Sequence, residues 1–101
     1  MDRRMAQQLQ QMQNKLMKAQ EELGTLNVEG TAGGSAVRVV MNGHRELQSI
    51  TISPEAVDPD DVETLQDMLV AAFNDASKKA QELSEQKLGG LTSGLNIPGL
   101  F

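Results

Sequence analysis

The 101-residue chain contains no cysteine, no tryptophan and no tyrosine, and it has only two phenylalanines. Without cysteine it forms neither a disulfide nor a thiolate metal site, and this composition is compatible with a reducing compartment. The scarcity of aromatic side chains argues against a protein that stacks its side chains on the bases of single-stranded nucleic acid.

Long apolar runs are also absent. No segment approaches the roughly 20 apolar residues of a membrane-spanning helix, and the opening residues 1–4 lead into glutamines rather than into the apolar core of a signal peptide. We therefore expect a soluble, cytoplasmic protein without a membrane partner. A chain of this length forms one small domain, which buries only about two thirds of the surface of the unfolded chain.

The sequence has few residues with which to build a catalytic or metal site. Its one histidine, His44, directly follows a predicted turn, and no cysteine accompanies it. The acidic run 58–61 is typical of the start of a helix, where carboxylates satisfy free backbone N–H groups. The glycine-rich segment 30–35 leads into a predicted strand and lacks a following Lys-Ser or Lys-Thr pair, so we interpret it as a hairpin loop rather than a phosphate cradle. We expect no enzyme activity, no cofactor, no metal and no small-molecule substrate.

Positive charge is scarce and unevenly distributed. The formal net charge of the whole chain is −5. Residues 1–50 carry six Lys and Arg against five acidic residues, whereas residues 51–101 carry three against nine, which gives net charges of +1 and −6. The N-terminal part is therefore a mildly basic arm on an acidic body, and it is the part better suited to meet a phosphate backbone.

The central motif of the chain is Asn42-Gly43, which lies between two strand-like runs. A tight hairpin turn needs positive φ at both of its central residues, and Gly and Asn tolerate positive φ better than other residues. We predict strands over residues 25–29, 36–41 and 44–53, joined in sequence order as an antiparallel meander.

The third predicted strand contains an irregularity. Leu47 has the opposite parity to Ile50 and Ile52, so these side chains would lie on opposite faces of a regular strand. All three face the core only if one extra residue is inserted between them. We therefore predict a β-bulge near residues 48–49.

Residues 2–23 contain neither glycine nor proline and are predicted to form a long helix. Its apolar residues recur at alternating spacings of four and three, a narrow stripe that is typical of a coiled-coil seam. We interpret the part from Leu16 to Leu26 as core and expect the first three residues of the stripe to contact another helix. The stripe consists of Met5, Leu9, Met12, Leu16, Ala19, Leu23 and Leu26.

A second long helix follows the sheet. Asp58 can cap its N-terminus and Pro59 suits its first position, and the apolar periodicity continues to about Leu88. The more apolar first half of this helix should lie on the sheet, and its polar second half should protrude. We predict a single domain over 1–88, followed by a Gly-rich apolar C-terminal tail over 89–101, which we expect to be mobile or to dock on a partner.

The predicted fold class is therefore α+β, an α-β-β-β-α protomer in which two long helices flank a three-stranded antiparallel sheet. Helices of about 22 and 30 residues extend about 33 and 45 Å, whereas strands of six to eight residues reach only about 20–27 Å. The small sheet leaves part of both apolar stripes uncovered, and its edges are open to pairing. We therefore expect a homodimer, which would cover these surfaces by using the sheet edge, the helices or both.

The basic residues on the two helices are the remaining candidates for a binding site. Each of them, taken alone, is most simply a solvated surface charge. Protruding helices from two subunits would nevertheless form a cleft that holds a DNA duplex through phosphate contacts, with binding that depends strongly on salt. The alternative is a dimeric scaffold or adaptor that binds another protein through the first helix or the C-terminal tail.

Four segments carry a likeness to a known family: Met12–Leu23, Val39–Leu47, Ile52–Pro54 and Leu69–Ala76. They resemble the YbaB/EbfC family of bacterial nucleoid-associated proteins, in order and over nearly the whole chain. The resemblance implies a tweezer-like homodimer in the cytoplasm and nucleoid that binds double-stranded DNA and acts in nucleoid organisation and gene regulation. We expect the sequence specificity of this binding to be low. Carried onto this chain, the protruding helices of the family imply DNA contacts at Arg3, Arg4, Lys15, Lys18, Lys78, Lys79 and Lys87.

Overall fold

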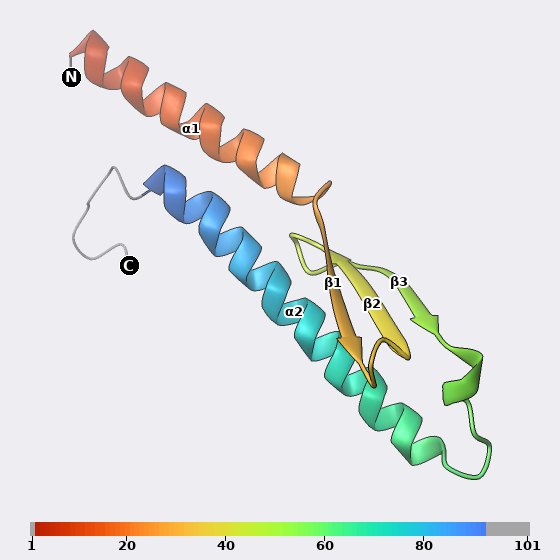
Figure 1. Ribbon diagram of the computed structural model, residues 1–101. Helices are drawn as coiled ribbons and strands as arrows, with labels where there is room; N and C mark the ends of the chain where they lie inside the picture. Colours follow the sequence, from red (N-terminus) through yellow and green to blue (C-terminus); the bar gives the residue numbers. More distant parts are fainter. Residues whose placement is uncertain (1, 93–101) are drawn as a thin grey trace.

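The chain folds in the order α-β-β-β-α, as shown in Figure 1. The computed structural model describes residues 2–92, so the part of the predicted tail that follows residue 92 lies outside the described residues. The predicted α+β fold class is confirmed. Helix α1 spans Arg3–Leu23, strands β1, β2 and β3 span Asn27–Ala32, Val37–Asn42 and Leu47–Ile52, a 3-10 turn spans Pro54–Ala56, and helix α2 spans Val62–Thr92.

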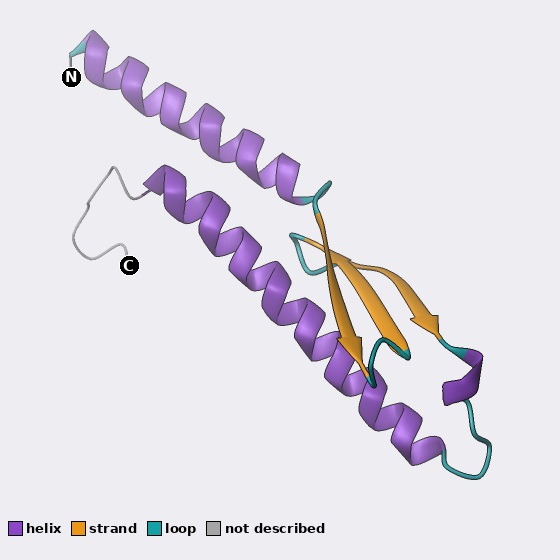
Figure 2. Ribbon diagram, viewed as in Figure 1, coloured by secondary structure: helices purple, strands orange, loops and turns teal. Residues whose placement is uncertain are grey.

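The three strands form an antiparallel meander in the order β1-β2-β3 (Figure 2). Leu47 of β3 pairs with Met41 of β2 and Ile50 pairs with Val39, while Gln48 is the extra residue where the register shifts. This is the predicted bulge. It brings Leu47 and Ile50 to the same face of the sheet as the core residues of β2.

Helix α2 packs across β1 and β2, and this contact forms the core. Val39 and Met41 of β2 meet Ala72 and Ala76 of α2, and all four side chains are fully buried. The closest approach is at Gly30 of β1, where a Cβ atom would lie 2.2 Å from the carbonyl oxygen of Ala72. The first half of α2 therefore lies on the sheet, as predicted, and it touches the backbone of β1 directly.

The first hairpin is tighter than predicted. Strand β1 covers residues 27–32 instead of 25–29, and the loop predicted over 30–35 shrinks to a turn at residues 33–36. Gly33, Gly34 and Ser35 in this turn all take positive φ. The predicted bounds of the strand and the loop were wrong because Gly30 lies within β1, where it contacts α2, and not in a loop.

The second hairpin lies where Asn42-Gly43 predicts it, but its geometry differs. Gly43 does not take positive φ, and the left-handed residue is Arg45, with φ 63°. The N–H of Arg45 donates to the carbonyl of Asn42 at 3.0 Å. Strand β3 consequently begins at residue 47 rather than 44. Glycine is required at position 43 because a Cβ atom there would lie 2.7 Å from the carbonyl oxygen of Leu23.

Helix α2 begins three residues later than predicted. Asp61 caps it: the carboxylate accepts a hydrogen bond from the Thr64 N–H at 3.3 Å and from the Thr64 hydroxyl at 2.6 Å. The carboxylate of Asp58 instead accepts from the N–H of Asp60 at 2.9 Å within the preceding turn. The predicted cap at Asp58, with Pro59 as the first helical residue, is therefore wrong, because the carboxylate of Asp58 folds back on its own turn.

The same helix also ends later than predicted. It continues through Gly89-Gly90 to Thr92 instead of ending near Leu88. A glycine in a helix interior costs only about 1 kcal/mol relative to alanine, and once a long helix is formed each further residue adds a backbone hydrogen bond. The division into a domain over 1–88 and a tail over 89–101 stays a prediction.

Beyond the sheet, α1 and residues 80–92 of α2 run antiparallel and form what we call the two-helix arm (Figure 1). Ala19 and Leu23 of α1 and Ala80 of α2 are buried. The predicted core role of the second half of the α1 stripe is thus confirmed at Ala19 and Leu23. It is wrong at Leu26, which is 37 % exposed because it lies past the end of α1.

Candidate nucleic-acid interface

A buried asparagine fixes the base of the two-helix arm. Asn42 is 4 % exposed, and its amide nitrogen donates to the carbonyl of Gly24 at 3.2 Å and to the carboxylate of Glu46 at 2.9 Å. Its side-chain oxygen accepts from the N–H groups of His44 and Glu46, both at 3.0 Å. This one side chain therefore joins the end of α1 to the β2–β3 hairpin, a role that sequence reasoning missed.

An ion pair joins the two helices of the arm. The Lys87 Nζ atom of α2 lies 2.7 Å from the Glu22 Oε2 atom of α1. The hydrogen bond from Lys87 holds the pKa of Glu22 below its usual value, and the charges of Lys87 and Lys18 act in the same direction. This pair joins α1 and α2 where the two helices lie side by side.

A hollow of about 350 Å³ opens beside this ion pair. Lys15 and Lys18 of α1 and Lys87 of α2 line it, together with Ala19 and Glu22. Three of the seven predicted DNA-contact residues are therefore brought together here, although they come from two helices. Three ammonium groups face a single carboxylate, which leaves the hollow with an excess of positive charge.

Arg3 and Arg4 lie at the N-terminal end of α1. The carboxylate of Asp2 caps this end by accepting a hydrogen bond from the Arg4 N–H at 2.8 Å. Both arginines are exposed, and neither forms an ion pair among residues 2–92. They are about 17 Å along the helix from Lys15, so they extend the basic surface of the arm without joining the hollow.

Lys78 and Lys79 lie at the base of the arm, away from the hollow. The Lys79 Nζ atom donates to the carbonyl of Glu29 at 2.9 Å and lies 3.2 Å from the carboxylate of Asp75. Asp75 also accepts the N–H of Thr31 at 3.1 Å. This backbone hydrogen bond is the main cause that lowers the pKa of Asp75, and Lys79 adds to it. Lys79 thus has a structural partner, whereas the neighbouring Lys78 is exposed.

The contacts of Asp75 and Lys79 also cover one edge of the sheet. The Thr31 N–H and the Glu29 carbonyl belong to β1, and both are bonded by side chains of α2. No such side chain from α2 reaches β3 in the part of the chain that the structure describes. The β3 edge is therefore the edge that remains open to pairing.

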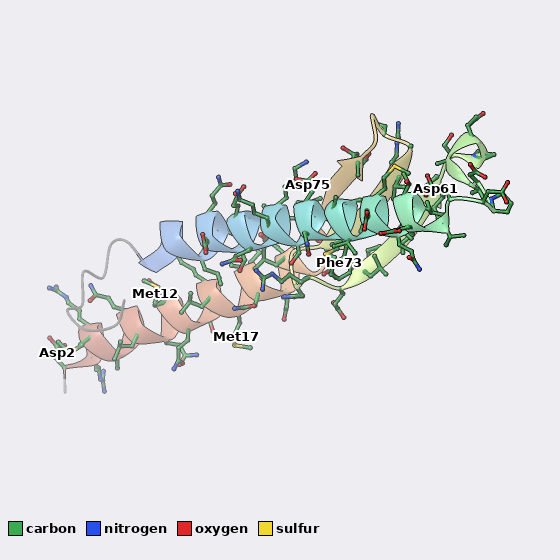
Figure 3. The ribbon with its side chains drawn as sticks, turned by 90° about the horizontal axis from the view of Figure 1, so that it is seen from below. Asp2, Met12, Met17, Asp61, Phe73 and Asp75 are labelled. Atoms are coloured by element: carbon green, nitrogen blue, oxygen red, sulfur yellow. The ribbon has the colours of Figure 1, made fainter. Side chains whose placement is uncertain are left out.

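An uncovered apolar face lies beside this open edge. Helix α2 covers β1 and β2 but leaves β3 exposed. Ile50 of β3 is 46 % exposed, and Val70 and Phe73 of α2 are 60 % and 44 % exposed. These three residues, with Val39 and Leu69, line an open groove of about 330 Å³, and Figure 3 shows Phe73 on the side of α2 next to β3. The first half of α2 lies on the sheet as predicted, but Val70 and Phe73 within it do not.

The groups that the arm presents are ammonium and guanidinium groups, which bind phosphate oxygens as charged hydrogen-bond donors. Among residues 2–92, no three His, Asp or Glu side chains lie close enough together to hold a metal ion. Over the same residues, neither long helix is apolar enough to cross a lipid bilayer.

Comparisons with known proteins agree with this architecture. The model of the YbaB/EbfC DNA-binding family matches residues 1–95. A nucleoid-associated protein of Chloroflexus aurantiacus is 63 % identical over 99 residues, which cover 98 % of this chain and 97 % of that protein. A nucleoid-associated protein of Pelotomaculum thermopropionicum is 57 % identical over 98 residues, covering 97 % and 93 %.

A solved structure shares the fold. The crystal structure of an uncharacterized protein from Helicobacter pylori superposes with a TM-score of 0.76 at 25 % sequence identity, covering 90 % of this chain and 97 % of that chain. The description of the family and the names of the relatives together indicate a nucleoid-associated DNA-binding protein rather than an enzyme, with a location at the nucleoid. By its match over residues 1–95 and by these relatives, the chain belongs to the YbaB/EbfC DNA-binding family.

Proposed function

We propose that the chain acts as a homodimer that binds duplex DNA with low sequence specificity through its two-helix arms, and that it thereby serves nucleoid organisation and gene regulation. The observation that carries this proposal is the hollow at which Lys15, Lys18 and Lys87 converge. It is a concentration of positive charge on a chain whose net charge is −5, and phosphate is the complementary partner.

The geometry of the arm supports low sequence specificity. Helix α1 has 21 residues and is therefore about 32 Å long, close to the roughly 34 Å of one turn of duplex DNA. Its basic residues lie at both ends of this length, with Arg3 and Arg4 at one end and Lys15 and Lys18 toward the other. Such contacts reach phosphates on a duplex, and phosphate contacts carry no direct sequence information.

The uncovered apolar face supports the homodimer. Ile50, Val70 and Phe73 surround one groove beside the open edge of β3. A second copy that meets this face around a two-fold axis buries the same residues twice, and full burial of each large apolar side chain contributes about 1.5–3 kcal/mol. The dimer would then carry two arms, one from each protomer, to hold a duplex between them.

The first test is a titration of duplex DNA of mixed sequence at two salt concentrations, with Lys15→Gln combined with Lys18→Gln. We expect the wild-type affinity to fall steeply with salt. In the variant, the slope of log K against log salt should decrease by about one for each phosphate contact removed. Arg38→Gln combined with Arg45→Gln is the matched control, because it removes the same charge from residues outside the arm.

The outcome of this titration separates the two classes of function. Binding that does not respond to salt, or equal losses in the variant and in the control, would contradict DNA binding through the arm. Absence of DNA binding would favour the scaffold or adaptor instead.

The second test addresses the end of the arm. Arg3→Glu combined with Arg4→Glu reverses two charges that form no ion pair among residues 2–92, so a loss of affinity cannot come from a broken internal contact. We expect weaker binding to all duplex sequences alike. The remaining proposed contacts are Lys78, Lys79 and Lys87. Because Lys79 and Lys87 also form ion pairs within the fold, unfolding curves of their variants should be measured before their DNA affinities are compared.

A further inference from the structure

The first half of α1 extends beyond the end of α2. Lys87 lines the hollow between the helices together with Lys15 and Lys18, and it pairs with Glu22. It therefore lies level with about residue 18 of α1, and Thr92, five positions later, lies level with about residue 13. The preceding residues of α1 continue about 15 Å past that point, and Figure 1 shows α1 extending beyond the end of α2.

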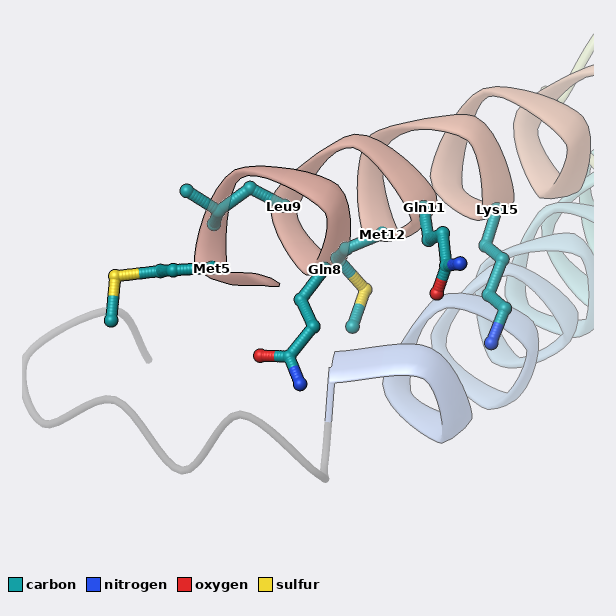
Figure 4. A pocket seen from close by; sticks show the side chains of 6 residues that line it. All are labelled: Met5, Gln8, Leu9, Gln11, Met12 and Lys15. Atoms are coloured by element: carbon teal, nitrogen blue, oxygen red, sulfur yellow. The ribbon is translucent and has the colours of Figure 1, made fainter. Parts of the chain in front are cut away.

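This extension carries an open apolar groove of about 320 Å³. Met5 and Leu9 lie on it with exposed fractions of 55 % and 51 %; Met12 also lines it, and Lys15 lies at its inner end, next to α2 (Figure 4). Met5, Leu9 and Met12 are the first three residues of the heptad stripe, for which the sequence predicts contact with another helix. Among residues 2–92 no element covers Met5 and Leu9, so the groove requires an occupant from elsewhere.

The sequence that follows α2 has the composition to fill this groove. Residues 93–101 read Ser-Gly-Leu-Asn-Ile-Pro-Gly-Leu-Phe and contain no charged side chain. Nine residues in extended conformation span about 30 Å, whereas Met5 lies only about 12 Å along α1 from the level of Thr92. The segment, which begins where α2 ends, is therefore long enough to cover the whole groove.

We propose that residues 93–101 of the same chain dock lengthwise in the groove of α1. An extended chain that starts level with about residue 13 of α1 brings Leu95 and Ile97 to the part of the groove at Leu9 and Met5. The segment brings no charged side chain into the groove, and the one charged residue that lines the groove, Lys15, lies at its inner end. Two further residues that line the groove, Gln8 and Gln11, supply amide donors and acceptors for its backbone.

The tether favours the segment of the same chain over other occupants. A short linker holds its binding segment at an effective concentration in the millimolar range, far above that of a separate molecule in dilute solution, and the mixing experiment below tests the partner chain of the proposed dimer. This proposal does not rest on DNA binding, and its test uses protein without DNA.

The absence of cysteine makes a direct test possible. A spin label is attached to Asn96→Cys in the full chain, and the ¹³C-methyl signals of the methionines are recorded with the label oxidised and reduced. The docked segment should abolish most of the signal of Met5 and Met12. Met17 is the internal control, because it is 63 % exposed and points away from α2 (Figure 3). It should keep more signal than Met5, although it lies closer to the start of the segment.

Two variants sharpen this test. Leu9→Ser removes an apolar residue from the groove and should restore the Met5 signal. Met17→Ser changes an exposed apolar residue outside the groove and should leave the loss at Met5 unchanged. Stronger loss at Met17 than at Met5, or no loss at either, would overturn the proposal. Loss at Met5 in a mixture of spin-labelled unenriched chains with ¹³C-labelled chains would assign the groove to a second copy and overturn it as well.

Discussion

The amide of Asn42 takes part in four hydrogen bonds that connect the end of α1, the hairpin and Glu46. We expect Asn42→Ala to lower the free energy of unfolding by about 2–3 kcal/mol, because it leaves buried backbone groups without partners. Urea unfolding measures this loss. Asn27→Ala is the matched control, since Asn27 pairs with Asn42 across the strands but is exposed. Equal losses in the two variants would contradict the role of Asn42.

Asn42 also shows which features of a turn can be predicted from a sequence pattern. Asn42-Gly43 predicts a turn from local backbone preferences, and the turn is there. The positive φ occurs at Arg45 instead. Gly43 makes a close contact with Leu23, a residue that is distant in sequence. Local preference therefore locates the turn, while the docking of α1 decides its geometry.

At the scale of elements, the seating of α2 on β1 depends on Gly30. A Cβ atom at this position would lie 2.2 Å from the Ala72 carbonyl oxygen and 2.3 Å from the Ala76 nitrogen. We expect Gly30→Ala to destabilise the protein by about 3 kcal/mol, because backbone on both sides resists the displacement. Thermal or urea unfolding measures it.

The matched control is Gly89→Ala in the second half of α2. A Cβ atom there meets no other atom within 4 Å, and alanine is the better helix former by about 1 kcal/mol. This substitution should therefore leave stability unchanged or raise it. A Gly30→Ala protein as stable as the wild type would show that α2 does not touch β1 as described.

Periodicity predicted the elements better than their ends. The heptad stripe predicts α1, and the parity of Leu47 and Ile50 predicts the bulge, because each pattern repeats over many residues. The start of α2 was wrong because Asp58 and Asp61 both satisfy the requirements of a helix cap. Which of the two caps the helix depends on the conformation of the turn that follows β3. No repeating pattern in the sequence reports that conformation.

At the scale of the whole molecule, the candidate site could be predicted only in part. The resemblance assigns basic residues one by one, but it does not show that Lys15, Lys18 and Lys87 share a hollow, which depends on the pairing of α1 with α2. Nor does the sequence show that Ile50 and Phe73 remain exposed. Their exposure arises because α2 covers only two of the three strands.

The proposed dimer requires that the uncovered face around Ile50 stay apolar. Ile50→Lys places a charge in the centre of the proposed interface and should separate the protomers. Thr51→Lys adds the same charge to the next residue of β3, on the opposite face of the sheet, and should not separate them. The pair of variants distinguishes loss of the interface from a general effect of charge.

The most direct test of the account is the solution mass of the protein by sedimentation equilibrium. A single chain has a mass of 10.9 kDa. We expect about twice this mass for the wild type and for Thr51→Lys, and the single-chain mass for Ile50→Lys. A wild type with the mass of one chain, or a dimer that Ile50→Lys leaves intact, would contradict the proposed dimer.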